Sequence, residues 1–165
     1  MVTREPDTDN LLDAVSRDDG AARSQLLDRH RELAWFLATC SDEGFRKPEE
    51  GLALADQAVA AMKDAPAGRT LGVARLRAGK PGPAAEALEK GLALAKRDDA
   101  VAWLFLAMVC WQLGDKDGAR AWYDRAAAWT EKERPSDPTL RRFRAEAAAL
   151  LGFKDSPQPA NSARS

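Results

Sequence analysis

The chain has 165 residues, of which 45% are hydrophobic and 31% are charged, with 25 basic side chains against 26 acidic ones. This length and composition are typical of one globular domain with a hydrophobic core, and they exclude fibrous and largely disordered classes. The net charge of −1 disfavours nucleic acid and anionic membrane surfaces as partners, because both attract proteins with a basic excess.

The N-terminal segment MVTREPDTDN lacks the apolar stretch of a secretory signal. Cys40 and Cys110 stand far apart in separate apolar runs, which favours buried thiols in a reducing compartment over a disulfide framework or a zinc site. We therefore expect a cytoplasmic location. Residues 1–8 and 153–165 are poor in core-forming side chains, so we expect both ends to be disordered.

Between these ends the sequence predicts helices, because Ala, Leu, Arg and Glu dominate and apolar residues recur every three or four positions. No segment shows the alternation of a strand. The first two helices are expected to bury one apolar side each, formed by Leu26, Leu27, His30, Leu33, Ala34 and Leu37 in the first and by Leu52, Ala55, Ala58, Val59 and Met62 in the second.

Farther along, the run AVAWLFLAMVCW at residues 100–111 contains no charged side chain. A bilayer span needs about 20 apolar residues, so this run of twelve predicts a buried helix rather than a membrane segment.

The middle of the chain contains an internal repeat. Residues 68–98 align with residues 103–133 at an offset of 35, which pairs Leu71 with Leu106 and Gly79 with Gly114. A weaker copy lies upstream, with Leu37 placed 34 residues before Leu71. Each copy predicts a helix of about twelve residues, a polar turn and a second helix, and the turn of the first copy is stretched by SDEGFRKP. Such pairs must stack to bury their apolar faces.

The repeat resembles the tetratricopeptide repeat, a 34-residue helix pair with the pattern Trp-x2-Leu-Gly-x2-Tyr followed by Ala-x3-Phe. It also resembles repeat segments of large bacterial signalling proteins, including Ser/Thr kinases. The positions that carry the resemblance are Trp103, Leu106, Ala119 and Tyr123 in the third copy and Leu71, Gly72, Ala84 and Leu88 in the second. Gly68 replaces the packing Trp in the second copy, and there we expect the weakest packing.

The resemblance implies an all-α fold: an α-solenoid of about three tetratricopeptide-type helix-turn-helix repeats with flanking capping helices. We expect one domain over residues 9–152. An amphipathic helix at 137–151, capped by Ser136 or Asp137 and by Gly152, is expected to cover the C-terminal end with Leu140, Phe143, Ala147, Leu150 and Leu151. The segment from Asp9 to Gly20 is expected to do the same at the other end. The expected repeats are 31–64, 65–99 and 100–134.

No motif in the chain predicts catalysis, a metal site or a cofactor. His30 is the single histidine, which excludes a His-rich metal cluster. GVARLRAGKP lacks the spacing of a phosphate-binding loop, and DKDG and RDDG lack the alternating ligands of a calcium loop. We therefore expect a protein that is not an enzyme.

In tetratricopeptide arrays the first helix of each pair lines a concave groove, and the resemblance implies that peptides bind there. We expect a scaffold or adaptor that binds a protein segment in this groove, with Arg69 and Arg77 pairing with carboxylates. The sequence does not decide whether Trp111 faces the groove or the core, and it does not identify the partner. The alternative is a structural subunit that self-associates through the groove or an end face. The expected groove residues are Trp35, Thr39, Arg69, Val73, Leu76, Arg77, Leu104, Met108, Trp111 and Gln112.

Overall fold

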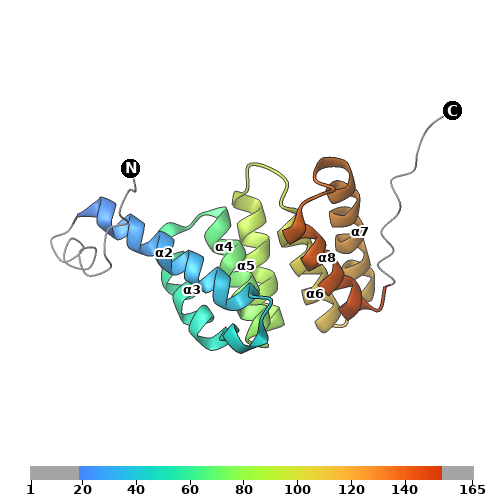
Figure 1. Cartoon of the computed structure of the whole chain (residues 1–165), viewed down its shortest axis with the longest axis horizontal. Helices are drawn as coiled ribbons and strands as arrows, with labels where there is room; N and C mark the ends of the chain where they lie inside the picture. Colours follow the sequence, from blue (N-terminus) through green and yellow to red (C-terminus); the bar gives the residue numbers. More distant parts are fainter. Residues whose placement is uncertain (1–18, 154–165) are drawn as a thin grey trace. The chain divides into compact units, whose positions relative to one another are not determined.

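The computed structural model describes residues 19–153, and these form seven α-helices and a short 3-10 turn, with no strand among them (Figure 1). The all-α prediction is confirmed. The expected disorder of residues 1–8 and of the tail from residue 154, and the capping segment expected before Gly20, lie outside the described residues.

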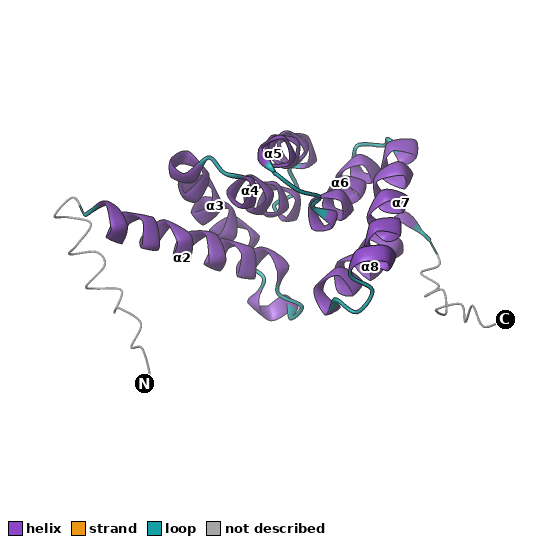
Figure 2. Ribbon diagram, turned by 90° about the horizontal axis from the view of Figure 1, so that it is seen from above, coloured by secondary structure: helices purple, strands orange, loops and turns teal. Residues whose placement is uncertain are grey.

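The chain divides into two compact units, one ending at Lys96 and the other beginning at Arg97. In the first unit, α2 packs on α3, α4 packs on α5, and both α2 and α3 also contact α4. In the second unit, α6, α7 and α8 contact one another pairwise (Figure 2). The helices of the first unit are α2 (Gly20–Thr39), α3 (Pro48–Met62), α4 (Ala65–Arg77) and α5 (Pro81–Leu94), with the 3-10 turn η1 (Glu43–Phe45) between α2 and α3; those of the second are α6 (Ala100–Gln112), α7 (Lys116–Glu133) and α8 (Pro138–Leu151).

Aspartate side chains set the start of most of these helices. Each accepts hydrogen bonds from backbone N–H groups of the first turn, which have no partner inside the helix. The remaining two helices, α3 and α5, begin with a proline in the first turn, where the missing N–H costs nothing. The capping aspartates are Asp19, Asp64, Asp99, Asp115 and Asp137.

Glycines close three helices at the positions that the repeat pattern indicates. Gly79, Gly114 and Gly152 have φ angles of 72°, 86° and 72°, in the left-handed region that favours glycine. The predicted turns of the second and third copies and the predicted end of the capping helix are therefore confirmed.

The expectation of weak packing at Gly68 is wrong. A Cβ atom built on Gly68 would lie 2.8 Å from the Cα atom of Gly91, and one built on Gly72 would lie 2.4 Å from Cγ of Leu88. The small residues therefore let α4 and α5 come into backbone contact. Glycine stands at position 68 because α4 and α5 approach closely there, and its lack of a side chain leaves no gap.

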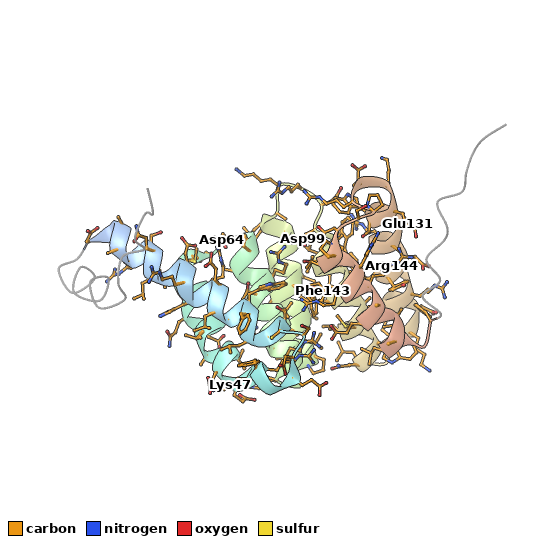
Figure 3. All side chains as sticks on the ribbon, in the orientation of Figure 1. Lys47, Asp64, Asp99, Glu131, Phe143 and Arg144 are labelled. Carbon is orange, nitrogen blue, oxygen red and sulfur yellow. The ribbon has the colours of Figure 1, made fainter. Side chains whose placement is uncertain are left out.

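In the second unit, α8 covers α6 as the capping prediction requires. Leu140, Phe143 and Leu151 are buried, and Asp137 rather than Ser136 caps the helix. Leu150 is 40% exposed, so its place on the predicted apolar side is wrong: its neighbour Leu151 points inward instead. An ion pair between Glu131 and Arg144, 3.0 Å apart, joins α7 to α8 (Figure 3).

The apolar run 100–111 forms most of α6, and every residue from Ala102 to Val109 is buried. Among the described residues, no helix has the length and apolar character that crossing a bilayer requires.

Candidate partner-binding site

Six of the ten expected groove residues belong to the first unit, and the structure brings them together on two helices in contact. Trp35 and Thr39 lie on α2, and the other four lie on α4. The guanidinium carbon of Arg69 lies 5.2 Å from the centroid of the Trp35 ring, within the range of a cation–π interaction. Both side chains are half-buried, so this stack joins α2 to α4 while part of each group still contacts solvent.

Arg77 has a role that the sequence reasoning missed. Its Nε atom donates a hydrogen bond to the backbone carbonyl of Ala38, with an N–O distance of 3.0 Å. Carbonyls in the last turn of a helix have no partner inside the helix, and a cation there also meets the negative end of the helix dipole. Arg77 therefore links α4 to the C-terminal end of α2.

Three of the expected groove residues in this unit lie below the surface. Val73 is fully buried, and Thr39 and Leu76 are each 5% exposed. The Thr39 hydroxyl donates to the backbone carbonyl of Trp35 at 2.7 Å. These three side chains support the surface formed by Trp35 and Arg69.

The other four expected groove residues lie on α6, in the second unit. Leu104 and Met108 are buried, with 0% and 1% of their surface exposed. Trp111 is half-buried, with Nζ of Lys116 lying 5.3 Å from the centroid of a Trp111 ring, and Gln112 is exposed. The accessible part of this set is therefore the C-terminal end of α6.

Several large apolar side chains are exposed that were not expected at the surface. Leu33, which was expected on the buried side of the first helix, is 47% exposed, so that expectation is wrong. Phe36 and Phe45 are exposed by 49% and 60%. Phe36 directly follows Trp35, and Phe45 lies in the stretched turn of the first repeat, where a large apolar residue is unusual. A phenylalanine in an otherwise polar turn was therefore a sequence signal for an exposed apolar side chain.

Within residues 19–153 no cluster of three or more His, Cys, Asp or Glu side chains is arranged to hold a metal ion. Cys40 and Cys110 form no disulfide with each other, and both are half-buried rather than fully buried as expected.

Helix pairs closed by glycine turns, with small residues where the paired helices touch, define a helical-hairpin repeat protein. A sequence model of the tetratricopeptide repeat family matches residues 69–138. The match runs from α4 to the first residue of α8 and supports a tetratricopeptide repeat protein. No curated protein matches the chain. Tetratricopeptide repeats form a non-catalytic fold that generally mediates protein–protein interactions.

Proposed function

We propose that the protein is a non-enzymatic interaction module that binds a segment of another protein on the first helices of its hairpins. The observation that carries this proposal is the half-buried stack of Arg69 on Trp35. Tryptophan and arginine are the residue types most enriched at the energetic centres of protein interfaces. Here a cation and an aromatic ring meet on the faces of two adjacent helices.

This arrangement favours a partner segment that carries an apolar side chain beside a carboxylate. The apolar side chain would cover the exposed part of the Trp35 ring, and the carboxylate would approach the Arg69 guanidinium, whose planar fork suits it. Arg77 contributes rigidity rather than charge, since its hydrogen bond to Ala38 holds α4 against α2. A surface fixed in this way loses less conformational entropy when a partner binds.

The second unit offers a further contact surface of its own at the end of α6. Trp111 lies next to the exposed Gln112 and beside the Lys116 ammonium group. Leu104 and Met108, farther toward the start of the same helix, are buried. We assign Trp111 and Gln112 to partner binding and the two buried residues to packing.

The experiment is affinity capture from a lysate of the native cell followed by quantitative mass spectrometry. The Arg69→Glu variant is expected to lose the principal partner. Lys90→Glu, an exposed position on α5, makes the same change of charge away from the stack and is the matched control. Equal recovery of every partner by wild type and a folded Arg69→Glu protein would refute the proposal for the first unit, and Trp111→Ala tests the second unit in the same way.

The alternative is a structural subunit that self-associates through an end face. Its support is the exposure of Leu150 on the terminal helix α8 and of Leu113 after α6, by 40% and 54%. Sedimentation velocity separates the two functions, because a protein that stays monomeric at high micromolar concentration does not assemble through these leucines.

A further inference from the structure

A second surface of the first unit is apolar, ordered and independent of the Trp35–Arg69 stack. Leu33 and Phe36 lie three positions apart on α2 and therefore share one side of that helix. Phe45 lies in η1, only a few residues beyond the end of α2. These three side chains are between 47% and 60% exposed. Leu33 and Phe36 thus form one exposed apolar strip, and Phe45 is exposed in the turn that follows the same helix; exposed apolar patches mark interaction sites.

The turn that carries Phe45 is held in place by hydrogen bonds. Oδ1 of Asp42 accepts from the Gly44 N–H at 2.9 Å. Nε of Arg46 donates to the Cys40 carbonyl at 2.7 Å, and the Lys47 N–H donates to the Leu37 carbonyl at 3.3 Å. The chain therefore folds back against the last turn of α2. Phe45 stays exposed in a turn whose backbone is fixed beside the end of α2.

The segment around Phe45, from Asp42 to Glu50, carries an excess of negative charge. Asp42 and Glu43 lie in the turn, and Glu49 and Glu50 lie in the first turn of α3; all four carboxylates are exposed. Two basic residues share the segment, and both are engaged. Arg46 donates to the Cys40 carbonyl, and Lys47 pairs with Glu50 at 3.1 Å. Carboxylates near exposed phenylalanines favour a partner with positive charge around an apolar contact.

We propose that Leu33, Phe36 and Phe45 form a docking surface for a basic amphipathic segment of a partner protein. Apolar side chains of that segment cover the two phenylalanines, and its lysines or arginines lie beside Glu43 and Glu49. An amphipathic helix with anchors three and four positions apart matches the spacing of Leu33 and Phe36. This surface is separate from the proposed binding face on α2 and α4. The inference about it does not depend on the proposed function.

Two synthetic helical peptides of about four turns test this inference on the full-length chain. Both present the same leucine stripe, but one carries lysines and the other glutamates on its polar side. Fluorescence anisotropy is expected to detect binding of the lysine peptide and not of the glutamate peptide. The affinity is expected to fall as salt is raised, because charge attraction between exposed groups is screened.

The variants then locate the binding site. Phe36→Ala/Phe45→Ala and Glu43→Gln/Glu49→Gln are each expected to weaken binding of the lysine peptide at least about tenfold, the size of one lost interface contact of about 1.4 kcal/mol. Leu94→Ala, which removes an exposed leucine of α5, is the matched control and is expected to change nothing. Because both phenylalanines are exposed, circular dichroism should match that of wild type.

Three results would overturn the inference. The first is equal binding of the two peptides, which would show that charge does not select the partner. The second is unchanged affinity in the folded phenylalanine variant, which would show that the peptide binds elsewhere. The third is a concentration-dependent dimer that the phenylalanine variant abolishes, since the occupant of the surface would then be a second copy of the chain.

Discussion

Nε of Arg77 lies 3.0 Å from the backbone carbonyl oxygen of Ala38, although the two residues are 39 positions apart in the chain. The neighbouring carbonyls of the same helix end are also occupied. The Phe36 carbonyl accepts from the Cys40 N–H and the Leu37 carbonyl from the Lys47 N–H. The carbonyls at the end of α2 thus accept hydrogen bonds partly from the following turn and partly from the next repeat. The Arg77 side chain links the two hairpins through one of these bonds.

Removing this hydrogen bond should destabilise the first unit. Arg77→Ala leaves the Ala38 carbonyl without its charged donor, and we expect the free energy of unfolding to fall by about 1.5–3 kcal/mol. Urea denaturation followed by circular dichroism measures the change. Arg75→Ala is the control: Arg75 lies on the same helix, but both its ion pair with Asp56 and its hydrogen bond to the Pro83 carbonyl are partly exposed, so its loss should cost about 1 kcal/mol or less. An equal fall in the free energy of unfolding in the two variants would contradict a stabilising role for the Arg77–Ala38 hydrogen bond.

The contact of Gly68 with Gly91 predicts that a substitution that favours helices should here be harmful. Alanine is better than glycine in a helix by about 1 kcal/mol. At position 68, however, the added Cβ would meet the backbone of Gly91, which cannot rotate away as a side chain can. We expect Gly68→Ala to destabilise the protein by about 1–3 kcal/mol, as other overpacked substitutions do.

Gly82→Ala provides the comparison for this prediction. Gly82 lies in the first turn of α5, and no atom lies within 4 Å of a Cβ built there. We expect Gly82→Ala to be neutral or slightly stabilising in thermal and urea denaturation. A Gly68→Ala protein as stable as the Gly82→Ala protein would show that α4 and α5 separate without cost.

Local signals in the sequence predicted the helices well, because their determinants lie within a few residues. The first helix of the third repeat closes at Gly114, as the predicted turn requires, and the structure adds Asp99 as the cap at its start. The period of 35 residues then placed the second and third hairpins without any knowledge of contacts. The same reasoning gave the capping helix at 137–151, within one residue of α8 at its start.

The surface residues were harder to predict, because their exposure depends on which helices cover them. In α6, apolar residues occupy every side of the helix, so periodicity could not separate Leu104 and Met108 from a solvent-facing side; both are buried. On α2, Leu33 follows the apolar period yet is exposed. The partner of Arg77 lies in another hairpin, beyond the reach of any local pattern.

The packing of Trp103 predicts a large energetic role in the second unit. Trp103 is 3% exposed and meets Trp129 edge-on at 6.4 Å between ring centroids, with the Arg125 guanidinium carbon 4.0 Å from a Trp103 ring centroid. Trp103→Ala should cost about 3–5 kcal/mol, because it removes a buried aromatic side chain. Arg125→Ala should cost only about 0.5–1 kcal/mol, since the Arg125 side chain is largely exposed.

Urea denaturation of the two variants, with amide exchange in α6 as a local readout, tests this ranking. Trp122→Ala is a useful reference, because Trp122 is half-buried on α7 and farther from Arg125, at 5.7 Å. The assignment of Trp103 as the packing aromatic fails if Trp122→Ala destabilises the protein more than Trp103→Ala does.

The contact between Phe105 and Phe143 predicts that α8 stabilises α6 rather than merely ending the fold. Both rings are fully buried, and their centroids lie 5.0 Å apart in an edge-on arrangement. Phe143→Ala should leave a cavity against α6, cost about 3–5 kcal/mol, and accelerate amide exchange around Phe105. Phe143→Leu keeps most of the volume and should cost about 1.5 kcal/mol or less. Leu150→Ala, on the exposed side of the same helix, should change stability by about 0.5 kcal/mol or less. If Leu150→Ala proved as costly as Phe143→Ala, the exposed side of α8 would itself be a packing surface, and the assignment of its two faces would have to be reversed.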